Sequence, residues 1–147
     1  NTIDLLKSSS EKDAAYFSET LTLQNDQHWK WRLQMVEAMA KQMDFGRFGI
    51  KGLYLIGSTK EATAGPASDI DLLIHVDEPK LNKSELQSWL EGWSLCLDEI
   101  NFNRTGYRTG GLLESHLITD KDIKNKTSYA VMINSINNSA KPIKLES

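Results

Sequence analysis

Two aspartates near the middle of the chain have the spacing of a metal site. Asp69 and Asp71 open the run Asp-Ile-Asp-Leu-Leu-Ile-His-Val, residues 69–76, which has the alternation of a β-strand. Successive side chains of a strand point to opposite faces, so both carboxylates share one face while Ile70 and Leu72 face a core. Like charges repel at this distance, and a hard divalent cation with oxygen ligands relieves that repulsion. The pair predicts a Mg²⁺ site, with Mn²⁺ as an alternative.

A glycine and a serine precede this pair, at the end of another apolar run. Gly57 and Ser58 follow residues 52–56, which have the composition of a strand. Glycine lets the backbone approach a ligand closely, and backbone amides and a hydroxyl group bind phosphate well. A phosphate-binding turn beside a metal site predicts a site for a triphosphate. Taken singly, the two motifs are also compatible with an ordinary turn and a solvated strand edge.

The order and spacing of the two motifs are more informative than either motif alone. A strand ending in Gly-Ser, ten intervening residues and Asp-apolar-Asp in a second strand are typical of the DNA polymerase β superfamily of nucleotidyltransferases. From Gly57 to Ile74 the chain resembles this family, especially its minimal bacterial and archaeal nucleotidyltransferase-domain proteins. The resemblance implies a divalent metal cofactor, two ions in the usual case, and a nucleoside triphosphate substrate.

In that family a third carboxylate from a neighbouring strand completes the two-metal site. The best candidate here is Glu114, which alternates with apolar Leu113 and would share its exposed face with His116. The family more often has aspartate at this place, and a solvated strand residue is the alternative interpretation. His75 and His116 stay outside the predicted catalytic set, because a lone histidine is usually structural. The predicted catalytic residues and metal ligands are Asp69, Asp71 and Glu114.

The predicted nucleotide contacts lie in the segment that joins the two strands. They are Gly57, Ser58, Lys60 and Ser68. Family members commonly carry an arginine-containing stretch after the Gly-Ser, and this sequence lacks one, which leaves Lys60 as the nearest cation. Arg104 and Arg108 precede the third predicted strand, where a phosphate or acceptor contact and a solvated loop are equally compatible with the sequence.

Three strands and two long helices are expected around these motifs. Apolar residues three and four positions apart predict helices over 26–43 and 84–99. The strands are expected at 52–57, 69–76 and 112–119. A short helix is also expected between residues 2 and 23, a helical turn over 120–126, a further element over 129–136 and a frayed tail from Asn137.

These elements predict an α/β (α+β) fold with a small mixed sheet. The helices would pack on one face of the sheet and leave the acidic site on the other. The whole chain, 1–147, is predicted to be one nucleotidyltransferase-like domain, with a helical region over about 1–45 and a core over about 46–136. The 39% hydrophobic content is enough for one packed core.

Composition also bounds the partners and the compartment. A net charge of -3 argues against a surface that holds long nucleic acid by charge alone. No apolar run approaches the roughly 20 residues that span a bilayer, so a cytoplasmic protein is predicted. Cys96, inside Leu95-Cys96-Leu97, is predicted to be a small core residue. The first residue is Asn1 rather than Met, which is compatible with processing or with a domain cut from a longer chain. Besides the nucleotide and the acceptor, a protein partner or the remainder of a longer chain is a candidate partner.

The predicted activity is metal-dependent transfer of a nucleoside monophosphate from a nucleoside triphosphate to an unidentified acceptor hydroxyl, with release of pyrophosphate. Two alternatives remain open. One is a catalytically silent module of the same fold that binds a nucleotide or a partner. The other is a metal-dependent phosphodiesterase, because two metal ions can also activate water.

Overall fold

A four-stranded mixed sheet carries the predicted motifs. The computed structural model describes residues 27–133 and 139–146, and it confirms the α/β class with a mixed sheet. The strands are β1 (Ile50–Ile56), β2 (Ile70–Val76), β3 (Leu113–Ile118) and β4 (Lys141–Leu145). Their order in the sheet is β3-β2-β1-β4, with β2 and β3 parallel and the other neighbours antiparallel.

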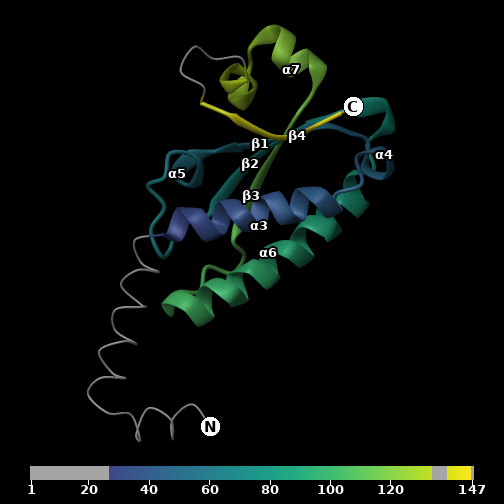
Figure 1. Ribbon diagram of the computed structural model, residues 1–147. Helices are drawn as coiled ribbons and strands as arrows, with labels where there is room; N and C mark the ends of the chain where they lie inside the picture. The colour runs from purple at the N-terminus through teal and green to yellow at the C-terminus, as the bar shows by residue number, and fades with distance from the viewer. Residues whose placement is uncertain (1–26, 134–138, 147) are drawn as a thin grey trace, which may run out of the picture.

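Two long helices cover one face of the sheet. They are α3 (His28–Gln42) and α6 (Lys83–Thr105), and Figure 1 shows both on the same side of the strands, with α7 (Asp120–Asn125) on the other side. The shorter elements are α4 (Phe45–Phe48), α5 (Gly57–Lys60), the 3-10 helix η1 (Glu78–Lys80) and the 3-10 helix η2 (Ser128–Met132). Side chains of the strands that face this helical layer are shielded from water, and they are accordingly apolar.

The core lies between the sheet and the two long helices. Every second residue of β2, namely Ile70, Leu72 and Ile74, is fully buried there, together with Leu53 and Leu55 of β1. The apolar stripes of α3 and α6 supply the facing surface, with Val36, Met39, Leu86, Leu90 and Leu97 among its members. Because side chains alternate along a strand, the residues between these core positions point to the face opposite α3 and α6.

The pairing of the strands sets which residues meet on that opposite face. Ile56 at the end of β1 pairs with Asp71, and Asp71 pairs on its other side with Glu114 of β3. Asp69 lies one residue before β2 rather than within it. The sheet therefore brings the end of β1 and two of the three predicted carboxylates to one place.

Helix α6 is longer than predicted. Its N-cap is Asn82, whose side chain accepts from the backbone N–H of Glu85, so the helix begins at Lys83, one residue before the predicted start. The helix continues to Thr105 and ends at Gly106, whose φ of 82° is left-handed. Residues 100–105, beyond the predicted end at residue 99, are thus helical, because no glycine or proline before Gly106 ends the helix.

Two further differences concern the tail and the cysteine. Residues 141–145, predicted as part of a frayed tail, form the edge strand β4. Cys96 is exposed, so the prediction of a core cysteine is wrong, and Leu95 beside it is 52% exposed while Leu97 is buried. Three consecutive residues of a helix cannot all face one core. The helix expected between residues 2 and 23 lies outside the described residues.

Candidate functional site

Two acidic side chains meet where β2 and β3 run side by side, and a third lies just before β2. Asp71 and Glu114 are paired residues of the two parallel strands, and a hydrogen bond joins their carboxyl groups. Asp69 lies close enough for its charge to act on Asp71, but among the described residues it does not belong to the group of ligand atoms that lie within 4.8 Å of one another. Like charges placed this close together repel one another, and each carboxyl group raises the cost of ionising its neighbour.

The crowding shifts the pKa of both aspartates upward. Partial burial is the main cause that raises the pKa of Asp71 to about 6, and the hydrogen bond with Glu114 and the charges of Glu114 and Asp69 add to it. Burial likewise raises the pKa of Asp69, followed by the charge of Glu114, while the guanidinium of Arg32 acts in the opposite direction. A bound cation would relieve this cost, because it favours the ionised form of each carboxyl group.

This shift predicts how the stability of the metal-free protein depends on pH. Asp71 holds its proton more tightly in the folded chain, with a pKa of about 6, than at its ordinary value of 3.8. Its contribution to stability is therefore full below pH 4 and lost as the pH rises through 6. We expect the melting temperature to fall over this range without metal, and to fall less in Glu114→Gln, which removes two of the causes.

Thermal unfolding between pH 4 and 7.5 in chelator-treated buffer measures this difference. Glu91→Gln, an exposed glutamate on α6, is the matched control and should follow the wild type. Identical pH profiles for Glu114→Gln and the wild type would contradict the coupling between the two carboxyl groups.

The backbone of the turn after β1 lies very close to the side chain of Asp71. Gly57 has a φ of 74°, a conformation that side-chain-bearing residues rarely adopt. A Cβ atom at this position would stand 2.4 Å from Oδ2 of Asp71. Gly57 and Ser58 begin the short helix α5, so the start of this turn lies directly beside the acidic cluster. Glycine is therefore required at this position by its close approach to Asp71, and its contact with a phosphate stays a prediction.

The two other predicted nucleotide contacts already have partners within the connecting segment. The ammonium group of Lys60 lies 2.9 Å from a carboxylate oxygen of Glu61. The hydroxyl of Ser68 accepts a hydrogen bond of 2.9 Å from the backbone N–H of Gly65. Either side chain would have to exchange this partner to contact a phosphate.

The two arginines expected in a loop lie elsewhere. Arg104 is in the last turn of α6, and its guanidinium lies over the ring of Trp31 at 5.1 Å from the ring centroid. Arg108 follows α6 and pairs with Glu99. Its guanidinium also lies over Phe102, 3.9 Å from the ring centroid. Both cations are thus held against α6 and α3.

A histidine left out of the predicted set belongs to the cluster. His116 lies two residues after Glu114 on the same face of β3, and Asp71, Glu114 and His116 each offer a ligand atom within 4.8 Å of the others. The Nε2 atom of His116 is 3.9 Å from Oε1 of Glu114. The alternation of β3 already placed His116 on the same face as Glu114. His116 was nevertheless excluded from the predicted site, because a lone histidine is usually structural. His75, in contrast, contacts Asp120 at 2.7 Å.

A fully buried arginine holds the segment that leads to Asp69. Arg32 of α3 has no exposed surface, and its Nε and Nη2 atoms donate to the carbonyl oxygen of Ser68 at 3.1 and 3.0 Å. Nη2 also donates to Oδ1 of buried Asn101, whose own amide donates to the carbonyl of Pro66. Burial is the main cause that lowers the pKa of Arg32 to about 10, so it stays charged at neutral pH. Sequence reasoning missed both residues.

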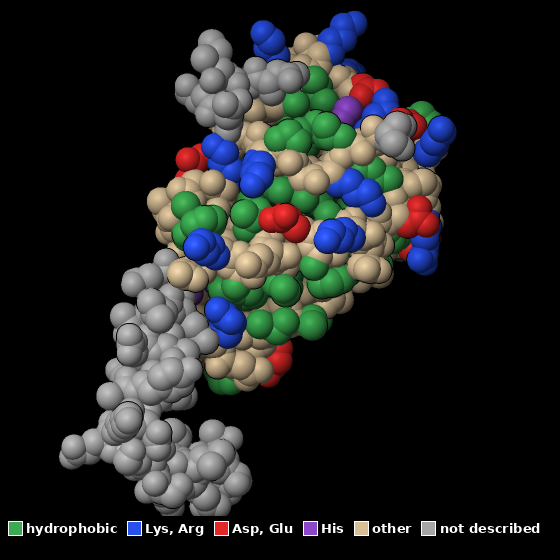
Figure 2. Space-filling model, viewed as in Figure 1, with side chains coloured by type: hydrophobic (Ala, Val, Ile, Leu, Met, Phe, Trp, Pro, Cys, Tyr) green, Lys and Arg blue, Asp and Glu red, His purple; other side chains and the backbone are tan. Residues whose placement is uncertain are grey.

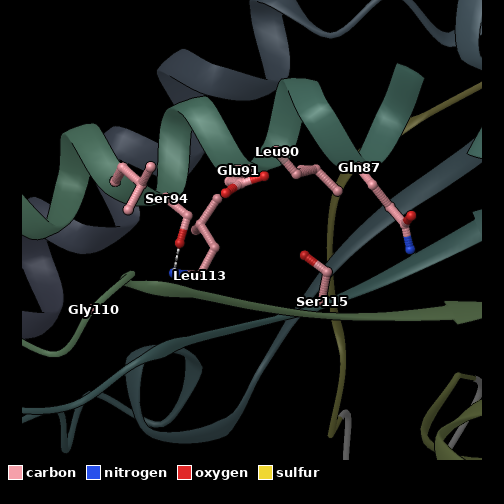
Figure 3. A pocket seen from close by; sticks show the side chains of 8 residues that line it. Gln87, Leu90, Glu91, Ser94, Gly110, Leu113 and Ser115 are labelled. Atoms are coloured by element: carbon pink, nitrogen blue, oxygen red, sulfur yellow. Dashed lines mark hydrogen bonds between the residues drawn. The ribbon is translucent and has the colours of Figure 1, made fainter. Parts of the chain in front are cut away.

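A separate cavity of about 290 Å³ lies between α6 and β3 (Figure 3). Its lining includes Gln87, Leu90, Glu91 and Ser94 of α6 and Leu113 and Ser115 of β3. Leu113 and Ser115 alternate with Glu114 along the strand, so the cavity and the acidic cluster lie on opposite faces of the sheet. The cavity is therefore not part of the acidic cluster.

The face shown in Figure 2 carries no continuous stripe of positive charge among its described residues. On the face shown in Figure 2, lysine and arginine side chains stand apart among neutral and hydrophobic ones instead of forming a continuous stripe. Proteins that track a nucleic acid backbone usually present such a stripe. Within residues 27–133 and 139–146, no helix combines the length and the apolar character needed to cross a membrane.

Comparisons with known proteins relate the acidic cluster to one family. The family model described as nucleotidyltransferase domain matches residues 37–128, a range that includes Gly57, Asp71, Glu114 and His116. Among solved structures, the chain is similar to the crystal structure of a putative nucleotidyltransferase from Sulfolobus solfataricus, with 12% identity, a TM-score of 0.36 and coverage of 83% of this chain and 85% of that one. No curated protein sequence matches the chain.

Proposed function

The chain belongs to the nucleotidyltransferase domain family, and from this premise we propose that it transfers a nucleoside monophosphate from a nucleoside triphosphate to an acceptor hydroxyl, with release of pyrophosphate. The observation that carries the proposal is the meeting of Asp71, Glu114 and the Gly57 turn at one end of the sheet. Carboxylates for a cation and an unobstructed backbone for a phosphate lie side by side there. A nucleoside triphosphate with a bound divalent cation matches this arrangement, because its cation can bind the carboxylates while its phosphate groups contact the turn.

The proposed cofactor is Mg²⁺, held by Asp69, Asp71 and Glu114. The residues fit such an ion, since all three offer carboxylate oxygens and the pKa of Asp71 is raised by burial and by its acidic neighbours, a cost that a cation would relieve. When bound, the cation neutralises charge on the triphosphate and makes a hydroxyl more acidic. The side chain of Glu114 is 55% exposed, so it has room to rotate toward a cation. This room matters because glutamate is longer than the aspartate that the family more often has at this position.

The triphosphate would occupy the turn that follows β1. Gly57 and Ser58 would face the β- and γ-phosphates with backbone amides and the serine hydroxyl, because no Cβ obstructs the turn. Lys60 would release Glu61 and turn to a phosphate oxygen, and Ser68 would contribute its hydroxyl after releasing Gly65. Lys60 would exchange one charge-assisted bond for another, whereas Ser68 would exchange a neutral bond for a stronger, charge-assisted one.

The chemical step needs one proton acceptor and one leaving group. The oxygen of the acceptor hydroxyl would attack the α-phosphorus in line and form the new P–O bond, while its proton passes to a carboxylate oxygen of Glu114. The bond between the α-phosphorus and the bridging oxygen breaks, and pyrophosphate leaves with that oxygen. Asp71 and Asp69 would hold the reacting groups in place, and such positioning supplies a large part of the acceleration in phosphoryl transfer.

Isothermal titration of ATP, GTP, CTP and UTP, with and without Mg²⁺, tests the proposal. We expect binding that depends on Mg²⁺ and disappears in Asp69→Asn/Asp71→Asn, since the variant removes two of the metal's anionic ligands. Glu99→Gln changes an exposed carboxylate that pairs with Arg108, and it should bind like the wild type.

Three results would contradict the proposal. Binding of none of the four nucleotides by the folded protein would remove the triphosphate site. Binding without release of pyrophosphate from any acceptor hydroxyl would favour the silent module. Hydrolysis of model phosphodiesters in place of transfer would favour the phosphodiesterase.

A further inference from the structure

We propose that His116 is a nitrogen ligand of the metal site, and that it makes one metal position prefer a transition-metal divalent cation over Mg²⁺. This inference rests on the proposed function, because it concerns the cation of the same site. It is carried by the place of His116 within the cluster.

The geometry suits two ligands of one ion. The Nε2 atom of His116 lies 3.9 Å from Oε1 of Glu114, which is too long for a hydrogen bond. Two ligands bound to one cation at roughly 2.1 Å stand roughly 3 to 4.2 Å apart. The three donor atoms of Asp71, Glu114 and His116 lie within 4.8 Å of one another, and the half-exposed Glu114 side chain has room to adjust when a cation binds.

The ring of His116 is also held in place. It stacks on Tyr129 of η2, with 4.0 Å between ring centroids and 31° between planes. Its side chain is 21% exposed, so it borders the solvent-accessible site without being free in solution. A ligand whose orientation is fixed before the cation arrives loses less conformational entropy on binding.

A second histidine on the same face provides the contrast. His75 lies on β2, but its Nε2 atom contacts Oδ1 of Asp120 at 2.7 Å, and the same aspartate binds Lys51. Its ring is therefore engaged in an ion-pair network beside α7. Of the two, only His116 has donor atoms of two carboxylates within ligand distance in the part of the chain that the structure describes.

The donor type decides the preferred cation. Mg²⁺ takes oxygen ligands and keeps several waters, whereas imidazole suits transition metals, whose affinities for a given site rise from Mn²⁺ through Co²⁺. A site of two carboxylates and one imidazole would thus bind Co²⁺ or Mn²⁺ more tightly than an all-carboxylate site does. Such a cation remains a Lewis acid for the triphosphate, so this preference is compatible with nucleotidyl transfer.

Titration of Co²⁺ and Mg²⁺ into the nucleotide-free protein at one fixed pH tests the inference, with calorimetry and the visible absorption of Co²⁺ as readouts. We expect His116→Gln to weaken Co²⁺ binding about tenfold or more and to change its absorption band, because a nitrogen ligand is lost. Mg²⁺ affinity should stay within about twofold, because imidazole contributes little to binding of this ion. His75→Gln is the matched control, and it should leave both affinities and the Co²⁺ spectrum unchanged.

The other outcomes separate this inference from the function it rests on. Equal Co²⁺ affinity and an unchanged spectrum in His116→Gln would overturn the nitrogen ligand, and Mg²⁺ binding that still depends on Asp71 would then leave the proposed function standing. An equal loss of Co²⁺ and Mg²⁺ would also overturn it, since the residue would then support the site without selecting the metal. Binding of neither cation by the wild type would contradict the proposed function and this inference together.

Discussion

Asp71→Asn is expected to abolish nucleotidyl transfer and leave the fold intact. Asp71 is the carboxylate that the sheet places between Glu114 and the Gly57 turn. Losing a ligand from a metal that stabilises transition-state charge costs several kcal/mol, so kcat should fall roughly a thousandfold or more. The folded state should not suffer, because asparagine removes a charge from a cluster that raises the pKa of Asp71 to about 6. Pyrophosphate release and thermal unfolding measure the two effects.

The matched control is Asp120→Asn. Asp120 is an aspartate at the start of α7 that binds His75 and Lys51 and lies outside the proposed site. Its loss should lower the melting temperature slightly and leave turnover within about twofold, as for other exposed ion pairs. Retained turnover in Asp71→Asn would refute the mechanism, and an equal loss of turnover in both variants would point to a general electrostatic effect.

The part of the site that depends on local periodicity could be predicted from the sequence. Alternation along single strands places Asp71 and Glu114 on exposed faces, and a strand that ends in Gly57 places the turn. The structure brings the three residues together because β1 and β3 both pair with β2 in the right register. Register follows from apolar patterning when one face is buried, as it is for β2.

What the sequence could not reveal depends on contacts between distant segments. Arg32 reaches Ser68 and Asn101, which are 36 and 69 residues away, and a cation on a helix usually indicates a solvated face. Strand β4 contains Pro142 and two lysines, which is the composition of a tail or of a protected sheet edge. Lys144 donates to two carbonyl groups at the end of α3, so its role emerges only after the fold is formed.

Arg32→Met is expected to destabilise the protein by about 3 kcal/mol or more. The guanidinium group is buried and donates to the carbonyl groups of Ser68 and His28 and to the side chain of Asn101. Methionine fills a similar volume but donates no hydrogen bond, so the carbonyl of Ser68 and the side chain of Asn101 would each lose a donor, at roughly 1–3 kcal/mol each. Arg32→Lys keeps the charge without the planar fork and should be intermediate. Urea unfolding at neutral pH measures the differences.

The same substitution should weaken metal binding beyond its effect on stability. Ser68 directly precedes Asp69, and Arg32 donates two hydrogen bonds to the carbonyl oxygen of Ser68. These bonds fix the backbone that positions the carboxylate of Asp69. Met39→Ala, in the same helix and fully buried, should lose a comparable roughly 2–5 kcal/mol through a cavity in the core. Under conditions where both variants are folded, we expect Mg²⁺ affinity to fall several-fold in Arg32→Met and to stay normal in Met39→Ala. Equal affinities would mean that Arg32 stabilises the fold without positioning Asp69, whereas a selective loss would tie this buried cation to the acidic site.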